Sequence, residues 1–93
     1  MMARFRRPTP SNVEASRAIQ ATVLRRIADL SATATKELEA ATSDPQERLT
    51  HLAAARTAEK QIDDAVIELA SAAVLGGMSA ADVARRSGIS TAT

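Results

Sequence analysis

Apolar residues recur every three or four positions through the first half of the chain, which is the spacing of one face of an α-helix. Ser11 and Glu14 form the capping-box pattern of a helix N-terminus, and no glycine or proline follows until Pro45. The pattern predicts a first helix over about residues 11–42. Its apolar stripe consists of Ile19, Val23, Ile27, Leu30, Ala34, Leu38 and Ala41.

The same spacing resumes after Asp44, a good N-cap residue, and Pro45, which suits the first position of a helix. Gly76 and Gly77 end the repeat, because glycine adopts the left-handed conformation common just after a helix. We therefore expect a second helix over about residues 45–75. Its stripe consists of Leu52, Ala55, Ala58, Ile62, Val66, Leu69 and Ala73.

The short connection between the two predicted helices favours an antiparallel helical hairpin over residues 11–77, and thus an all-α fold. Alanine occurs 21 times in the sequence, so the two stripes can approach closely but bury little area. Apolar surface should remain open on the far side of such a hairpin. We expect a homodimer, in a four-helix bundle, to cover it. The alternative is a monomer in which the C-terminal segment folds over the seam.

Residues 78–93 form a third segment, which begins with a helix start signal of its own. Ser79 and Asp82 form a second capping box, and Met78 and Val83 are spaced for a hydrophobic staple. Gly88 supplies a turn, which should end a short helix near residue 87. Ser90 follows it and can cap a further helix.

This segment resembles the helix-turn-helix of bacterial and phage transcription regulators. Ala84 matches the small residue between the two motif helices and Gly88 the turn glycine, with Val83 and Ile89 as the apolar residues beneath. The resemblance implies that the helix after the turn enters the major groove of DNA and that the second predicted helix supports the motif. It also implies a shortened recognition helix, since Thr93 follows the turn closely. The implied DNA-binding residues are Arg85, Arg86, Ser90, Thr91 and Thr93.

The first ten residues are basic and end in Pro-Thr-Pro, which favours an extended arm. Arg4, Arg6 and Arg7 of this arm are further candidates for contacts with DNA phosphates. The alternative is a solvated terminus without a role. Residues 1–26 carry a net charge of +5 and residues 27–68 one of −5, so antiparallel helices can pair opposite charges.

Composition argues against several classes of site. The chain has no cysteine and one histidine, His51, which we expect at an exposed helix position. Metal sites built on cysteine or on several histidines are thereby excluded. No nucleophile or phosphate-binding motif is present, so we expect no enzyme, metal or cofactor. No apolar run is long enough to span a membrane, and we expect a cytoplasmic protein.

Two functional hypotheses remain. The first is a small transcription-regulator-like protein that dimerises through its hairpin and binds double-stranded DNA or the transcription machinery. The second is a protein–protein interaction module, such as an antitoxin, adaptor or phage-encoded inhibitor, without DNA binding of its own.

Overall fold

The computed structural model describes residues 8–88, which form three helices and no strand. The helices are α1 (Pro10–Ser43), α2 (Arg48–Leu75) and α3 (Ala80–Ser87). The prediction of an all-helical fold is confirmed for this part of the chain. Within it, no helix combines the length and the apolar composition that crossing a membrane requires.

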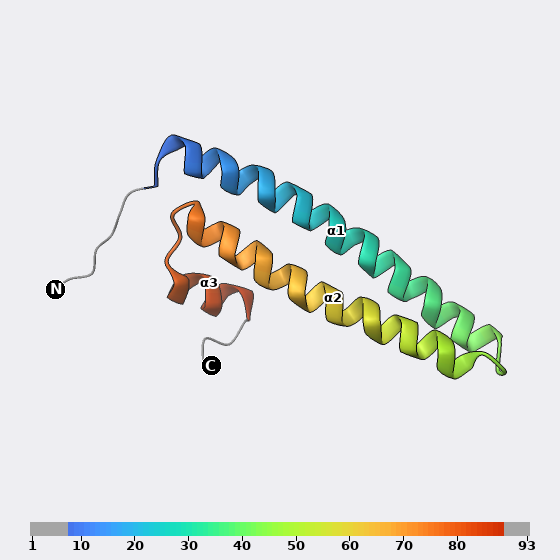
Figure 1. Cartoon of the computed structure of the whole chain (residues 1–93). Coiled ribbons are helices and arrows are strands. Elements are labelled where there is room, and N and C mark those ends of the chain that lie inside the picture. Colours follow the sequence, from blue (N-terminus) through green and yellow to red (C-terminus); the bar gives the residue numbers. More distant parts are fainter. Residues whose placement is uncertain (1–7, 89–93) are drawn as a thin grey trace.

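The two long helices lie side by side and run in opposite directions, and α3 folds back beside the C-terminal end of α2 (Figure 1). The contacts between helices join α1 to α2 and α2 to α3. The end of the pair that carries α3 is called the base below, and the end with the α1–α2 connection is called the tip.

Two helix starts differ from the sequence-based expectation. Thr9, and not Ser11, is the N-cap of α1, since its hydroxyl accepts a hydrogen bond of 3.1 Å from the backbone N–H of Asn12. α2 begins at Arg48, three residues later than predicted. Asp44 does cap backbone donors, but Oδ1 accepts from Gln46 N at 3.1 Å within the connection instead of starting the helix. Such a local turn competes with the first turn of a helix.

Small side chains form the buried seam between α1 and α2. On α1, Val23 is 1% exposed and Ser16 2%, and Ala34 and Ala41 are also buried. On α2 the buried residues are Ala55, Ala58, Ala65 and Ala72. Ala58, Ala65 and Ala72 follow one another at intervals of seven residues, which is the repeat of a coiled coil. Alanine at these positions lets the two backbones approach closely, and half-buried larger residues such as Ile27 and Ile62 lie between them.

Three residues of the predicted stripes lie at the edge of the seam. Ile19, Leu38 and Leu52 are 40%, 47% and 38% exposed, whereas buried seam residues are 9% exposed or less. Ala73 is half-buried, while its neighbour Ala72 lies in the seam. The physical reason is the close approach of the helices, which favours small residues in the seam and leaves longer side chains at its edges. The remaining predicted stripe residues are buried or half-buried: Val23, Ile27, Leu30, Ala34, Ala41, Ala55, Ala58, Ile62, Val66 and Leu69.

Polar contacts connect the two long helices near both ends. At the base, the Ser16 hydroxyl donates a hydrogen bond of 2.6 Å to the Ala72 carbonyl oxygen. At the tip, Arg48 Nε donates to the Ala41 carbonyl oxygen at 2.9 Å, and His51 Nδ1 lies 2.8 Å from Glu37 Oε1. His51 is therefore half-buried and paired, not exposed as predicted. It joins the two helices near their connection.

Opposite charges also meet across the middle of the pair. Arg26 Nη1, in the basic first segment, lies 2.7 Å from Glu68 Oε2, in the acidic middle segment. Both side chains are about half exposed. An exposed pair of this kind contributes only about 0–1 kcal/mol to stability. It nevertheless favours the antiparallel register in which the two oppositely charged segments face each other.

Candidate nucleic-acid interface

A tight glycine turn sets the position of α3. Gly77 has φ of +113°, a left-handed conformation that side chains disfavour, and its N–H donates to the Val74 carbonyl oxygen at 3.0 Å. The next N–H, of Met78, donates to the Ala73 carbonyl oxygen at 3.1 Å. These two bonds are those of a Schellman motif, which closes the end of a helix and reverses the chain. α3 therefore begins directly beside the end of α2.

At the start of α3, one of the two hydrogen bonds of the predicted capping box is present. Ser79 adopts an extended conformation, and its hydroxyl accepts a hydrogen bond of 3.1 Å from the Asp82 backbone N–H. The Asp82 carboxylate, however, is paired with Arg85 one turn further on. In its first-turn position this carboxylate still favours the helix through the helix dipole.

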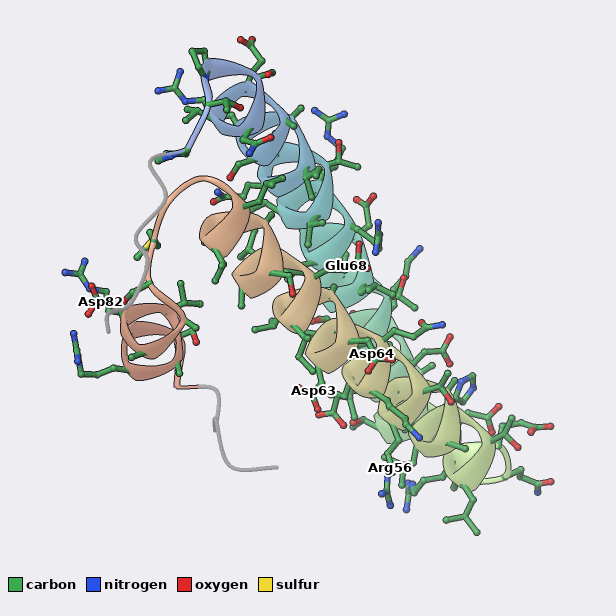
Figure 2. All side chains as sticks on the ribbon, turned by 60° about the vertical axis from the view of Figure 1, so that its left-hand side comes forward. Arg56, Asp63, Asp64, Glu68 and Asp82 are labelled. Atoms are coloured by element: carbon green, nitrogen blue, oxygen red, sulfur yellow. The ribbon has the colours of Figure 1, made fainter. Side chains whose placement is uncertain are left out.

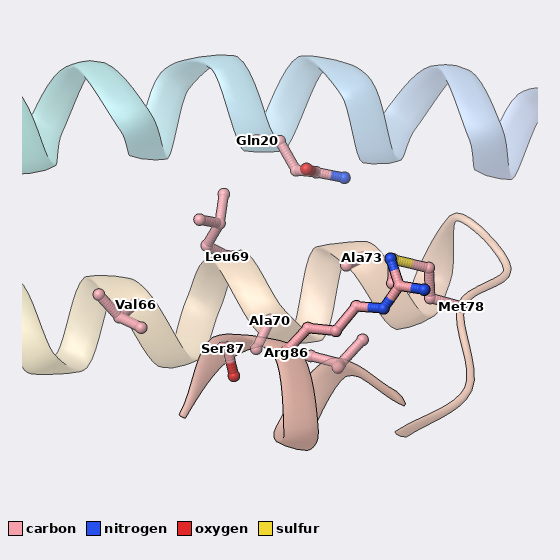
Figure 3. Close-up of a pocket in the computed structure, with 9 residues that line it drawn as sticks. Gln20, Val66, Leu69, Ala70, Ala73, Met78, Arg86 and Ser87 are labelled. Carbon is pink, nitrogen blue, oxygen red and sulfur yellow. The ribbon is translucent and has the colours of Figure 1, made fainter. Parts of the chain in front are cut away.

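Val83 anchors α3, since it is only 7% exposed. Residues of all three helices and the glycine turn surround an open groove of about 220 Å³ beside it (Figure 3). The lining residues are Gln20, Val66, Leu69, Ala70, Ala73, Met78, Val83, Arg86 and Ser87. These mostly apolar residues pack one face of α3 against α2. The opposite face of α3 is open to solvent.

The last turn of α3 carries two adjacent arginines, Arg85 and Arg86, both exposed. Arg85 is paired with Asp82, whereas the Arg86 side chain extends along the groove toward Met78 (Figure 3). Gly88 then ends the helix with φ of +78°, and its N–H donates to the Ala84 carbonyl oxygen at 3.1 Å. The turn predicted at Gly88 is therefore present, and its conformation is left-handed.

The remaining predicted DNA-binding residues lie outside the residues that the structure describes: Arg4, Arg6, Arg7, Ser90, Thr91 and Thr93. One contact does bear on the N-terminal segment. A Cβ atom on Gly77 would lie 2.8 Å from Pro8 Cγ, so Pro8 packs against the turn that leads into α3.

Sequence reasoning missed the polar anchor at the base of the hairpin. The Ser16 hydroxyl also accepts a hydrogen bond of 2.9 Å from Gln20 Nε2, and Gln20 lines the groove beside α3. Ser16 lies seven residues before Val23, so its position in the repeat was a usable signal. Ser16 was not predicted, because serine is polar and the helix stripe was defined by apolar residues.

Acidic residues of α2 do not assemble into a metal site. Asp63 and Asp64 project in different directions from the helix (Figure 2). Within residues 8–88, no three acidic or histidine side chains are grouped closely enough to hold a metal ion.

Comparison of the chain with protein-family models, with curated proteins and with solved structures found no match.

Proposed function

We propose that this protein is a small DNA-binding regulator in which the paired helices α1 and α2 dimerise and α3 is the first helix of a helix-turn-helix. The observation that carries the proposal is the α3 unit itself. Its inner face is held on α2 by Val83, its end is a left-handed glycine turn, and its last turn presents Arg85 and Arg86 to solvent.

The distribution of cations supports phosphate binding at the base. Arg85 and Arg86 lie there on α3, at the end of the hairpin where Pro8 packs against the glycine turn. Arginines that neutralise phosphates release counterions, so binding of this kind weakens steeply as salt increases. DNA is expected at the base and not at the tip.

A titration of fluorescent duplex DNA with the protein at several salt concentrations tests the proposal. The double variant Arg85→Ala/Arg86→Ala should bind more weakly, and its salt slope should fall by about 2, because each arginine that neutralises a phosphate contributes about 1 to the slope. The matched control is Arg56→Ala/Lys60→Ala, which removes the same charge from exposed positions of α2. Equal weakening by both double variants would contradict a specific role for α3.

The exposed leucines favour a second candidate, a protein-interaction module. Leu24, Leu38 and Leu49 are 53%, 47% and 80% exposed, and apolar side chains in such number on one small protein suit a protein partner. Absence of DNA binding even at low salt would favour this candidate over the first.

A further inference from the structure

One side of the hairpin retains large exposed apolar side chains, and it is the side on which α3 lies. Gln20 of α1 and Val66 of α2 both line the groove beside α3. Leu24 lies one helical turn after Gln20, and Leu52 lies two seven-residue repeats before Val66, so both leucines lie on this same side. Because α3 packs on α2 near the base and not on α1, it leaves four leucines of this side exposed: Leu24, Leu38, Leu49 and Leu52. We call these four leucines the leucine face.

On α1 this side continues as an uncharged stripe that repeats every three or four residues. It is separate from the seam with α2, and all of its members are exposed. The members are Ala21, Leu24, Ala28, Ser31, Thr35, Leu38 and Thr42. This spacing is that of a coiled-coil contact, so α1 presents a second helix-packing surface that no helix within residues 8–88 covers.

The two leucines of the stripe are equidistant from Ser31, which suits a second copy of the same helix. Leu24 lies seven residues before Ser31 and Leu38 seven residues after it. If two copies of α1 pack antiparallel with Ser31 on the twofold axis, Leu24 meets the partner's Leu38, and the same contact occurs again across the axis. A twofold interface requires this kind of self-complementary pattern.

Charges at the edge of the stripe fit the same arrangement. Arg25 and Glu39 each follow one of the two leucines, so an antiparallel pair places Arg25 beside the partner's Glu39. A parallel pair would instead place Arg25 and the partner's Glu39 on opposite edges of the contact, because both residues lie on the same edge of α1.

The available surface is of the size that a dimer needs. The stripe spans residues 21–42, which is about 33 Å of helix, and a helix is about 10 Å wide. Two such helix faces give roughly 700 Å² per chain, close to the ~800 Å² that each partner buries in an interface of standard size.

We propose that a second copy of this chain packs antiparallel on the leucine face, with Ser31 at the twofold axis and Arg25 beside the partner's Glu39. The inference rests on the dimerisation in the proposed function and specifies its surface and orientation. The partner's Leu49 and Leu52, at its tip, then lie toward the apolar groove beside α3. Each base, with its Arg85 and Arg86, is at one end of the resulting four-helix bundle.

Mass measurement by light scattering, in the absence of DNA, tests the surface. The wild-type protein should have twice the 9.8 kDa mass of one chain. Leu24→Glu/Leu38→Glu should weaken association about tenfold or more and yield monomers with unchanged helical circular dichroism, since both residues are exposed in one chain. The control is Ile67→Glu, which places the same charge at a residue that is 54% exposed and not on the leucine face, and should stay dimeric. A monomeric wild type, or a dimeric Leu24→Glu/Leu38→Glu variant, would overturn the proposal.

The orientation has its own test. Arg25→Glu and Glu39→Arg should each weaken the dimer by juxtaposing like charges, and the double variant Arg25→Glu/Glu39→Arg should restore it. Because the chain has no cysteine, Ser31→Cys should form a disulfide-linked dimer on oxidation, and exposed Thr33→Cys, which faces another way, should not. A dimer in which Ser31→Cys fails to cross-link would refute the antiparallel axis. These readouts involve no DNA, so their failure is distinguishable from failure of Arg85 and Arg86 to bind it.

Discussion

Ser16 and Ala72 lie 56 residues apart in the chain, and the hydroxyl of the first donates a buried hydrogen bond of 2.6 Å to the carbonyl oxygen of the second. The contact fixes the start of α1 against the end of α2. It leaves no room for a side chain at Gly76, where a Cβ atom would lie 2.6 Å from Ser16 Oγ. The base, on which α3 is mounted, therefore depends on a small polar residue and a glycine.

Substitution of Gly76 should reveal this close approach. Gly76→Ala is expected to destabilise the protein by about 1–3 kcal/mol, because the new methyl group overpacks the contact with Ser16. Ser16→Ala alone should cost about 1 kcal/mol, because its hydrogen bond is removed. Urea denaturation measures both values. In the Ser16→Ala background, Gly76→Ala should cost less than in wild type, and an equal cost in both backgrounds would show that the two residues do not interact.

Truncation of Val83 should release α3 while leaving the long helices intact. Val83→Ala removes buried methyl groups and should cost about 2 kcal/mol, or roughly 30-fold faster amide exchange in α3. Hydrogen exchange measured by mass spectrometry on residues 80–87 checks the change. Val74→Ala provides the control, since Val74 is 42% exposed and lies outside the groove lining. Exchange that accelerates equally in α1 would mean that α3 is not an independent unit.

Asp82 should weaken DNA binding, because it pairs with Arg85 in the last turn of α3. Asp82→Asn frees the guanidinium and removes a negative charge near the proposed phosphate contacts. The affinity for duplex DNA at low salt should rise about twofold to fivefold, the range expected for an exposed charge pair. Asp64→Asn makes the same charge change on α2 and should have a smaller effect. If Asp82→Asn bound DNA more weakly, the α3 contact would be misassigned.

The glycine at the end of α3 should tolerate asparagine better than alanine. Gly88 has φ of +78°, and among residues 8–86 no atom lies within 4 Å of the position where a Cβ would be. Gly88→Ala should therefore cost about 1 kcal/mol from backbone strain alone, and Gly88→Asn should cost less. Exchange rates of the α3 amides in the two variants measure this difference. Equal rates in both would argue that the left-handed turn is not maintained in solution.

Sequence reasoning predicted the all-helical fold and the helix boundaries that carry strong local signals, but not the starts of α1 and α2. The glycine pair after Leu75, the Ser79 cap and the Gly88 turn each act within a few residues and do not depend on tertiary contacts. The α1–α2 seam was harder to predict, because neighbouring alanines such as Ala72 and Ala73 fit two adjacent stripes equally well. Large residues such as Leu38 dominate an apolar pattern, whereas a close helix contact selects small ones.

The candidate site was predictable only where local sequence determines it. Val83 and Gly88 could be identified from the spacing of caps and apolar residues. Two features of the site depend on how distant segments meet: the extension of Arg86 along the groove, and the packing of Pro8 against Gly77. No spacing rule within one helix contains that information.

DNA binding at the base is tested most directly by a map of backbone amide chemical shifts as short duplex DNA is added to the isotope-labelled protein. We expect the largest changes in residues 79–88 and beside Gly77, and no change in residues 40–55 at the tip. Changes concentrated at the tip, or none at low salt, would contradict DNA binding at the base.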